Sequence, residues 1–562
     1  MRESVRNHRA IIAFLLAMAV TMSCVLGASA AFIRTIEAPG GVGDVVALTN
    51  VLTQFSALSD DDRKNARIWL QPGTYNLSGV YMNSTHHLSM SQSAGGLFAG
   101  LGDGPEDTVL VGGGETEAHG VLVMGGGGNF GFNTISNLTI TGGWTTSNGG
   151  AVSGSSSSVY RNLIVSNNCA KGTGNGAGGG GCFKGRAYNC LFANNRTSER
   201  WGGGMATGSE TYCNMSPTEG QGAWSCTFVG KSAYQCGGGL AINGGGRCVG
   251  CCFTNNTTSG NGGGVFVQTV NYRSMNKDGY TPLTSKIVDC VFVGNGGGGF
   301  HTAAGLVGVS NCVFRLNKGG ATAIRGDIKD SIFECNTNDT GVVGNSAMER
   351  CVVRNNAVKN RYATAIDYCA DGTTCYTNVN CLIESNGYLD EYGKLLYRKA
   401  YVNCTIIGNY IPNGGNYGYL ERNCTFWNCV LWGNKISTST QRDVRTMDMY
   451  NNPLAVAMTN CVFVSSDLDA ADIGADGVIT HDGFGNCRQI AKAALKLVDV
   501  PNGDYTPSTR SPLYDKGLAD DWIVDLVGYR DLADGQRIFG RGLDIGAYEC
   551  QLDKPGMMLI FR

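Results

Sequence analysis

One short phrase recurs four times between Asp289 and Asn356, and its spacing constrains the fold more than any other feature. Each copy has a polar or charged residue, then cysteine or serine, then two apolar residues, with an asparagine three residues further on. The copies are Asp289-Cys290-Val291-Phe292, Asn311-Cys312-Val313-Phe314, Asp330-Ser331-Ile332-Phe333 and Arg350-Cys351-Val352-Val353, followed by Asn295, Asn317, Asn336 and Asn356. A phrase that returns about every 20 residues is typical of a solenoid, in which one repeat cannot bury its apolar face alone.

Within the phrase the side chains alternate with a period of two, as in a short strand. Cys312 and Phe314 are expected to point one way, and Asn311 and Val313 the other. Glycine clusters between the phrases turn the chain, so equivalent strands stack about 4.8 Å apart and form ladders of Cys, Phe and Asn. Asparagines in such a ladder bond along the column and tolerate the left-handed backbone of a tight corner. The sequence therefore predicts an all-β fold, a right-handed parallel β-helix.

The composition fits a long solenoid of many turns. The chain has 562 residues, 84 of them Gly, only 16% charged residues and a formal net charge of −2. Gly is about twice its usual share and charge lies below the usual ~25%. This balance gives no reason to expect nucleic acid or an acidic polymer as the partner.

The first thirty residues have the three parts of a secretory signal. Arg2, Arg6 and Arg9 precede an apolar run over 10–20, and a small-residue stretch ends at Ala30. We expect residues 1–30 to be removed and the mature chain to be exported, to an extracellular or outer-surface location, with no transmembrane span of its own. The alternative, a lipoprotein carrying its lipid on Cys24, is disfavoured because no aliphatic residue stands where that signal has one.

The 23 cysteines raise the question of disulfides, since 22 remain once Cys24 is removed with the signal. Ten occupy the same place in the phrase: Cys190, Cys226, Cys251, Cys290, Cys312, Cys351, Cys381, Cys404, Cys429 and Cys461. Stacked side chains with parallel Cβ vectors make the disulfide torsion awkward, so these are expected to be buried, mostly free thiols. Cys369 and Cys375 are the better pair for a loop disulfide. A zinc site at Cys248, Cys251 and Cys252 is disfavoured because no histidine stands near them.

The order of elements divides the chain into five parts. Apolar residues at helical spacing predict a capping helix over 44–58, with Asp44 as N-cap, followed by strands over 67–70 and 74–77. The parts are the signal 1–30, the N-terminal cap and first coils 31–108, the parallel β-helix 109–466, a C-terminal cap 467–549 that closes the solenoid, and a tail 550–562. A cap at each end covers the exposed strand edges.

Two sets of motifs resemble known families. Phrases such as Gly149-Gly150-Ala151-Val152, paired with Phe-x-x-Asn, resemble the repeats of the polymorphic outer-membrane protein family over about 149–356, and imply a β-helical passenger segment. Ser511-Pro512-Leu513-Tyr514-Asp515-Lys516-Gly517 and Asp544-Ile545-Gly546-Ala547-Tyr548-Glu549 resemble the end region of bacterial choice-of-anchor Q domain proteins. In that family the region precedes variable surface-sorting tails.

Binding residues are expected on the later coils. The aromatic residues Tyr388, Tyr392, Tyr397, Tyr401, Trp427 and Trp432 can stack on sugar rings, or they can fill the core and the inserted loops. The acidic residues Asp467, Asp469, Asp472 and Asp476 are a candidate calcium site, and calcium is the one cofactor that the sequence suggests. Because they lack the regular Asp-x-Asp-x-Asp-Gly loop, a solvated acidic turn is the favoured alternative. The pair His86-His87 in a polar stretch is expected to be a solvated loop.

The function expected from these features is non-catalytic binding of glycans or other cell-surface polymers. A loop over 272–284 and the aromatic residues above are its predicted contacts. The rival class is a polysaccharide lyase or glycoside hydrolase with a site assembled from neighbouring coils, for example from Asp367, Asp371, Glu384 and Arg354. A structural surface stalk is the third class.

Overall fold

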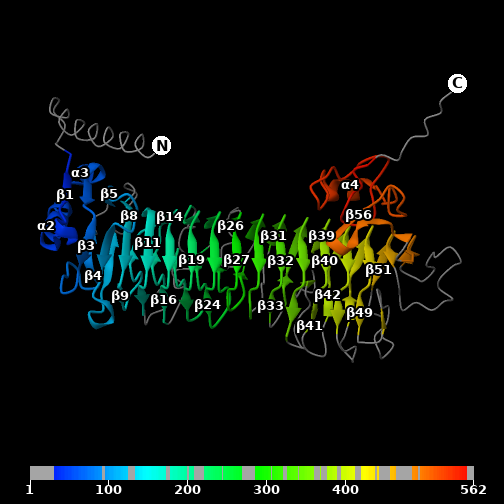
Figure 1. Ribbon diagram of the computed structural model, residues 1–562, viewed down its shortest axis with the longest axis horizontal. Coiled ribbons are helices and arrows are strands. Elements are labelled where there is room, and N and C mark those ends of the chain that lie inside the picture. The colour runs from blue at the N-terminus through cyan, green and yellow to red at the C-terminus, as the bar shows by residue number, and fades with distance from the viewer. Residues whose placement is uncertain are drawn as a thin grey trace, which may run out of the picture.

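The coils of the solenoid follow the recurring phrase directly, and they stack into one long rod (Figure 1). The computed structural model describes residues 31–90, 95–124, 133–171, 178–198, 201–207, 220–243, 245–268, 285–304, 307–319, 326–338, 341–359, 367–368, 376–388, 394–411, 419–436, 440–441, 456–463, 484–491 and 494–552. All but two of the pairings between named strands in these residues are parallel. The antiparallel ones join β49 (Lys435–Ile436) to β50 (Thr440–Gln441) and β55 (Leu497–Asp499) to β56 (Asp504–Pro507). The predicted right-handed parallel β-helix is confirmed. None of the helices in these residues is long and apolar enough to cross a membrane.

Two long faces of the rod meet at a corner. The first face is built from β8 (Asn133–Thr141), β11 (Val159–Ser166), β14 (Arg186–Tyr188), β18 (Gly222–Trp224), β22 (Arg247–Val249), β26 (Ser285–Val288), β29 (Val307–Ser310), β31 (Gly326–Lys329), β35 (Ser346–Glu349), β39 (Thr377–Val379), β43 (Ala400–Val402), β47 (Thr425–Trp427), β51 (Ala457–Thr459) and β53 (Phe484–Gly485). The second face contains β15 (Leu191–Ala193), β19 (Thr227–Val229), β23 (Cys252–Thr254), β27 (Val291–Val293), β30 (Val313–Arg315), β32 (Ile332–Glu334), β36 (Val352–Arg354), β40 (Leu382–Glu384), β44 (Thr405–Ile407), β48 (Val430–Trp432), β52 (Val462–Phe463) and β54 (Arg488–Gln489). β8 and β11 are long enough to turn the corner and contribute to both faces.

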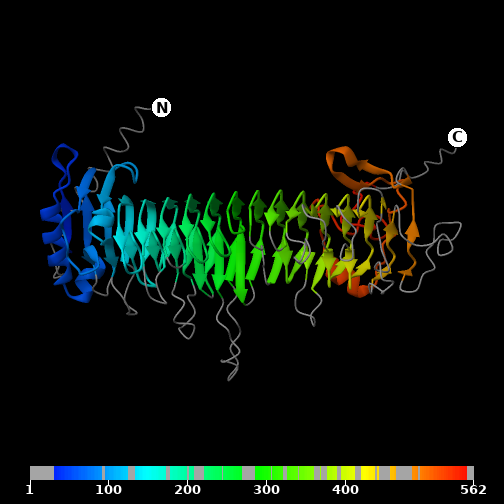
Figure 2. The ribbon, with the colours of Figure 1, turned by 90° about the horizontal axis from the view of Figure 1, so that it is seen from below.

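Short strands form a further long side of the rod, seen from below in Figure 2, and many of them follow a run of glycines. They are β4 (His86–Met90), β7 (Gly120–Met124), β10 (Val152–Ser153), β13 (Cys182–Phe183), β17 (Met205–Ala206), β21 (Leu240–Asn243), β25 (Val265–Gln268) and β28 (Phe300–Ala304), then β34 (Val343–Gly344), β38 (Asp367–Tyr368), β42 (Lys394–Tyr397) and β46 (Tyr419–Arg422). Glycine is required here: a Cβ on Gly203 would lie 2.4 Å from the carbonyl oxygen of Gly238 in the next coil.

The interior is filled by columns of identical side chains. Phe292, Phe314 and Phe333 stack almost parallel, with ring centroids 4.6 Å apart at each step. The column cysteines are all buried free thiols in this structure. Ser331 fits the same column because its Oγ accepts the N–H of Cys312 at 3.1 Å and donates to the carbonyl of Lys329 at 2.7 Å. Each position of the repeat phrase thus supplies one side chain to a column in the interior.

The asparagine ladder differs from the prediction in one respect. The ladder asparagines are buried and bond from coil to coil, as Asn295 does to Asn317, but their own backbone is not left-handed. The residue just before each one takes that conformation, as Gly294 (φ 66°) and Leu316 (φ 56°) do. A second left-handed position, held by Asn311 (φ 51°) and its equivalents, forms the corner between the two long faces. We call the latter the corner column.

The N-terminal end is capped as expected. Helix α2 (Val45–Ser56) begins at Asp44, whose carboxylate accepts the N–H of Ala47 at 2.8 Å, and it buries Leu48, Val51, Leu52 and Phe55. Helix α3 (Asp60–Asn65), β1 (Ile33–Ile36), β2 (Arg67–Leu70), β3 (Gly73–Asn76), β5 (Gly96–Gly100) and β6 (Thr108–Val111) complete this end. The apolar side of α2 packs into the same core as the first coils.

The predicted C-terminal boundary of the solenoid is too early. β53 pairs with β51 and β54 pairs with β52, so a further coil follows residue 466. Its phrase is Asn486-Cys487-Arg488-Gln489, where two polar residues replace the apolar pair and hide the repeat. Cys487 is nonetheless buried and extends the cysteine column.

The C-terminal segment, residues 494–552, covers the last coils from the side. It contains β55 (Leu497–Asp499), β56 (Asp504–Pro507) and helix α4 (Asp521–Val527), which lie above the late coils in Figure 1. Corner-column amides bind its backbone: Asn380 donates to Val527 O at 2.8 Å, and Asn460 donates to Lys516 O at 2.8 Å. The prediction placed this cap across the end of the rod. It lies along the side because the outward residues of these coils are apolar.

Candidate functional site

Most of the predicted aromatic residues are packed inside the protein. Tyr401 is fully buried and stacks on Phe426 of the next coil, with ring centroids 5.0 Å apart. Tyr388 is buried in the same core. Trp432 faces outward from β48 but is covered by the C-terminal segment, where it packs with Tyr505 and Leu513 among others. These three rings are therefore not available to stack on a sugar.

The rest of the predicted aromatic set does not form a continuous face. Trp427 is half-buried and meets Trp522 of α4 edge-on, with centroids 5.4 Å apart. Tyr397 is half-buried and lies under the guanidinium of Arg398 at 4.9 Å. Tyr392 and the loop over 272–284 lie outside the described residues, as do the proposed calcium ligands Asp467, Asp469, Asp472 and Asp476 and the proposed disulfide of Cys369 and Cys375.

The residues suggested for a catalytic site serve as structural contacts where they are described. Arg354 donates to Glu334 through Nε and Nη2 at 3.0 and 2.8 Å. Glu384 accepts a short hydrogen bond from the Tyr505 hydroxyl, which ties the C-terminal segment to β40. Asp371 lies outside the described residues, and Asp367 sits on β38 in register with Leu396. In the described part of the chain no group of three His, Cys, Asp or Glu residues is arranged to hold a metal ion.

His86 and His87 are buried on β4, whereas a solvated loop was expected. His87 has acceptors on both ring nitrogens, the carbonyl of Gly120 at 3.0 Å and the carboxylate of Glu117 at 3.2 Å, so both bonds form together only in the imidazolium. Hydrogen bonds from the Ser78 hydroxyl and the Gly79 N–H lower the pKa of Glu117 to about 2. Burial, and then His119, lower the pKa of His86 to about 4. The Glu117 carboxylate accepts hydrogen bonds from Ser78 and Gly79 and contacts His87, so it holds the 78–81 turn against β4.

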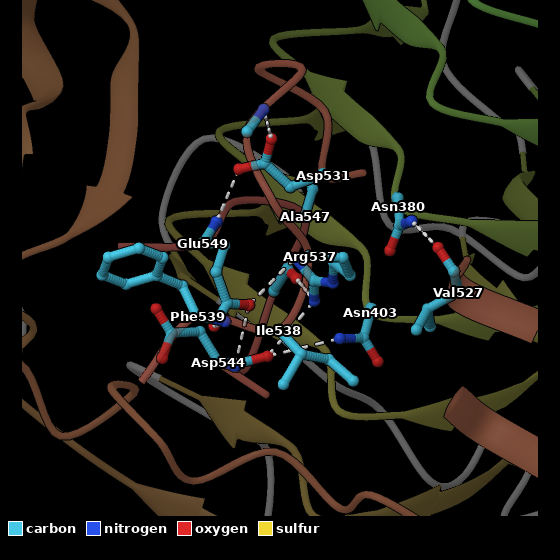
Figure 3. A network of polar contacts seen from close by, with 12 residues as sticks. Asn380, Asn403, Val527, Asp531, Arg537, Ile538, Phe539, Asp544, Ala547 and Glu549 are labelled. Atoms are coloured by element: carbon cyan, nitrogen blue, oxygen red, sulfur yellow. Dashed lines mark hydrogen bonds and ion pairs between the residues drawn. The ribbon is translucent and has the colours of Figure 1, made fainter. Parts of the chain in front are cut away.

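A second buried polar network lies in the C-terminal segment (Figure 3). Arg537 is fully buried and donates to the carbonyl of Gly546 at 2.7 Å, with the Glu549 carboxylate 3.7 Å from its Nη1. Asp544 and Asp531 accept backbone N–H groups, including that of Cys550 at 2.8 Å. Burial raises the pKa of Asp544 to about 6 and that of Glu549 to about 8. These residues hold the segment together through bonds to its own backbone.

The exposed feature that suits a ligand lies on the first face, over five consecutive coils from β11 to β26. It contains four cations and two aromatic rings, which we call the basic strip: Arg161, Arg186, Tyr188, Trp224, Arg247 and Lys286. Strand alternation sends Ala187, Cys248 and Ile287 into the core, so the residues on either side of them face outward. The strip is therefore a direct product of the strand period.

Its side chains are arranged in two columns. Arg247 stands directly opposite Lys286 on the neighbouring strand, and both are exposed. Beside them Tyr188 stacks on Trp224 with centroids 4.9 Å apart, and Arg161 lies over the Tyr188 ring at 4.6 Å. The stacking fixes the aromatic rings as a rigid base next to the cations.

The cations of the strip differ from those of the middle coils in their partners. The ion pairs of the middle coils include Arg315–Glu334, Arg354–Glu334, Lys329–Glu349, Arg350–Asp330 and Arg350–Glu349, at 2.5 to 3.3 Å. Within the described residues, Arg161, Arg247 and Lys286 pair with no carboxylate. Like charges opposite each other on adjacent strands repel. An anionic ligand along the strip relieves that repulsion.

The sequence contains a signal for this strip that the net charge conceals. Arg186, Gly222, Arg247 and Lys286 each stand four residues before a column cysteine, and Tyr188, Trp224, Val249 and Val288 stand two before it. Irregular insertions separate these positions along the chain. Aligning the coils on their cysteines brings the cations together.

No protein-family model matches this chain, and no curated protein matches it. Among solved structures, the chain is similar to the A-module of the mannuronan C-5 epimerase AlgE6 from Azotobacter vinelandii, with 14% identity over 71% of this chain and 97% of that one and a TM-score of 0.28. It is also similar to the pectate lyase Pel9A, with 13% identity over 89% of this chain and 90% of that one and a TM-score of 0.23. At these TM-scores the likeness carries no argument about activity.

Proposed function

We propose that the protein is an exported, surface or extracellular β-helix protein that binds an extended, negatively charged polysaccharide along the basic strip, without turnover. The observation that carries the proposal is the row of exposed cations, Arg161, Arg247 and Lys286, that pair with no described carboxylate. Their spacing follows the rise of the coils, so a polymer with repeated acidic groups meets several of them at once.

Further features support this proposal. The aromatic pair Tyr188 and Trp224 supplies apolar area beside the charges, as polysaccharide sites commonly do. The signal-like residues 1–30 support export, and the resemblance of residues 503–549 to choice-of-anchor Q domain proteins supports a surface location. The function expected from sequence also named a polymer partner, but it placed the contacts on aromatic residues of the late coils and on the loop over 272–284. The present proposal places them on the basic strip of the early coils.

The test uses the mature chain and a panel of immobilised polysaccharides. We expect retention on polygalacturonate, weakening as salt rises because exposed charges are screened. The double substitution Arg247→Gln/Lys286→Gln is expected to lower affinity about tenfold, since two exposed charge contacts together amount to roughly 1.4 kcal/mol. A neutral glucan should not show this salt dependence.

The matched control is Arg315→Gln/Lys329→Gln, which removes the same charge from paired cations of the middle coils. It should leave binding within about twofold of the wild type. Equal losses in both double variants would reduce the effect to net charge and overturn the proposed site. New reducing ends or unsaturated products would identify a hydrolase or lyase. Retention on none of the polysaccharides would favour the third class, a structural surface stalk.

A further inference from the structure

Two buried thiols meet beneath the basic strip. Cys248 points inward from β22, and Cys290 stands at the corner one coil later, just before β27. Their Sγ atoms are 3.6 Å apart, and both residues are fully buried. They are 42 positions apart in the sequence, so only the winding of the solenoid brings them together.

This pair differs from the stacked cysteines of the column. Cys290 and Cys312 are equivalent residues in successive coils, so their side chains run parallel, which disfavours the disulfide torsion. Cys248 comes from the first face, at a position where the neighbouring coils have Ala223 and Ile287. Its thiol therefore approaches Cys290 across the corner, from a different direction.

The hydrogen bonds give the same distinction. Column thiols donate to the carbonyl two residues earlier, as Cys290 does to Val288 O at 3.2 Å and Cys312 does to Ser310 O at 3.2 Å. The Cys248 thiol instead contacts two other thiols, that of Cys290 at 3.6 Å and that of Cys251 in its own coil. A disulfide thus replaces a weak thiol contact with a covalent bond and costs Cys248 no carbonyl bond of that kind.

We propose that Cys248 and Cys290 form a disulfide that joins the two coils carrying Arg247 and Lys286. In the reaction, one thiolate attacks a low-molecular-weight disulfide such as oxidised glutathione, and the second thiolate then displaces the bound thiol. One S–S bond forms in the protein, the two protein thiols lose two electrons and two protons, and the oxidant is reduced to two thiols. Because both sulfurs are buried, the exchange takes place before these coils close.

The location gives the link a role in the strip. Arg247 immediately precedes Cys248, and it is the register partner of Lys286. The two coils therefore carry like charges that repel, and they are separated by a long insertion in the chain. A covalent link between them holds the two cations at a fixed spacing. This role rests on the proposed function of the strip, whereas the link itself does not.

The test is refolding of the full chain with oxidised and reduced glutathione, followed by alkylation, tryptic digestion without reductant and mass spectrometry. Cleavage after Arg247, Arg273, Lys286 and Arg315 gives peptides 248–273 and 287–315. We expect one cross-linked species of these two peptides, which tandem fragmentation assigns to Cys248 and Cys290. The remaining column cysteines should all be alkylated once the protein is unfolded.

Variants make the assignment independent of fragmentation. Cys248→Ala should abolish the cross-link, and alanine fits because Ala223 occupies the same place one coil earlier. Cys312→Ser is the matched control, because Ser331 already occupies this column, and it should keep the cross-link. Full alkylation of both peptides, or a link from Cys251 to Cys290, would overturn the proposal.

A second measurement tests the role in the strip. Amide exchange in β22 and β26 should be about tenfold faster in Cys248→Ala than in the oxidised wild type, because local opening is no longer restrained. Polygalacturonate retention should weaken in the same variant. If the wild type contains the cross-link but Cys248→Ala is retained as strongly as the wild type, the role in the strip is wrong. If retention is absent in every form, it is the proposed function that fails, and the disulfide stands.

Discussion

The side-chain oxygen of Asn317 accepts two hydrogen bonds from Asn295 of the preceding coil, one from its backbone N–H at 3.0 Å and one from its Nδ2 at 2.9 Å. The Nδ2 group of Asn317 in turn donates to the carbonyl of Phe292 at 3.0 Å and to Asn336 at 2.9 Å. A single buried side chain therefore satisfies polar groups on both neighbouring coils. Removing it leaves several buried donors and acceptors without partners.

We expect Asn317→Ala to cost about 2–4 kcal/mol of local stability, because each unsatisfied buried group costs roughly 1–3 kcal/mol. Chemical denaturation and hydrogen exchange of β27, β30 and β32 measure the effect. The control is Asn311→Gly at the exposed corner column, where a left-handed residue (φ 51°) tolerates glycine and the loss should stay below about 1 kcal/mol. Similar losses at both positions would contradict the ladder as a source of stability.

The phenylalanine column gives a second prediction. Phe314 is fully buried between Phe292 and Phe333, so Phe314→Ala should cost ~3–5 kcal/mol. Because each coil contacts only its neighbours, the loss of exchange protection should be confined to the adjacent coils. Val313→Ala, which changes an outward side chain of the same strand, is the control and should cost far less. Loss of protection along the whole rod would instead indicate global cooperativity.

The fold was predictable because one rule repeats. A buried cysteine, a buried phenylalanine and a buried asparagine recur in register, and each needs only its equivalent one coil away. The same rule explains why Cys487 was missed: Arg488 and Gln489 follow it, so the alternation that marks the other coils is absent. The sequence pattern identifies a coil only when the residues on both faces of its strand follow the alternation seen in the other coils.

The site was less predictable because it depends on contacts between distant segments. Trp432 was named as a candidate binding residue, yet Tyr505 and Leu513, more than seventy residues later, cover it. A buried His87 was likewise hidden by its polar neighbours in the sequence, because its carboxylate partner Glu117 comes from the following coil. Conversely, Arg247 and Lys286 are far apart in the sequence, and they become neighbours only because β22 and β26 pair in successive coils.

The C-terminal segment should become less stable as the pH rises. Burial raises the pKa of Glu549 to about 8 and that of Asp544 to about 6, so the folded state binds more protons than the unfolded state above about pH 4. The stabilisation is fully present below the unfolded pKa values and is lost as the pH passes 6 and then 8. Limited proteolysis of residues 494–552 between pH 5 and pH 9 should show increasing cleavage.

The substitution Glu549→Gln removes the group with the higher pKa while keeping its shape. Its accessibility to protease should change less between pH 7 and pH 9 than that of the wild type. Asp499→Asn, at an exposed edge of the same segment, serves as the control and should follow the wild type. Cleavage that is independent of pH in the wild type would rule out the buried carboxylates as its cause.

The last prediction concerns the one lysine in the asparagine ladder. Lys231 stands between Asn195 and Asn256, where its backbone N–H donates to Asn256 Oδ1 at 3.1 Å and its Nζ donates to the carbonyl of Val229 at 2.9 Å. Burial lowers the pKa of its amine to about 6, against about 10.4 in an unfolded chain. The unfolded state therefore binds the additional proton between these values, and stability should rise with pH from about 6 toward 10.

Substituting Lys231→Asn restores the side chain used in the neighbouring coils and removes the titrating group. Chemical denaturation at pH 6, 7 and 8 should show the wild type gaining up to about 1.4 kcal/mol per pH unit in these coils, a slope that the variant lacks. At pH 6 the variant should be the more stable protein, because it has no amine to keep neutral in the core. Lys171→Asn, at an exposed lysine, should keep the wild-type slope. A slope that survives in Lys231→Asn would assign the titration to another group and leave the lysine as a neutral replacement in the ladder.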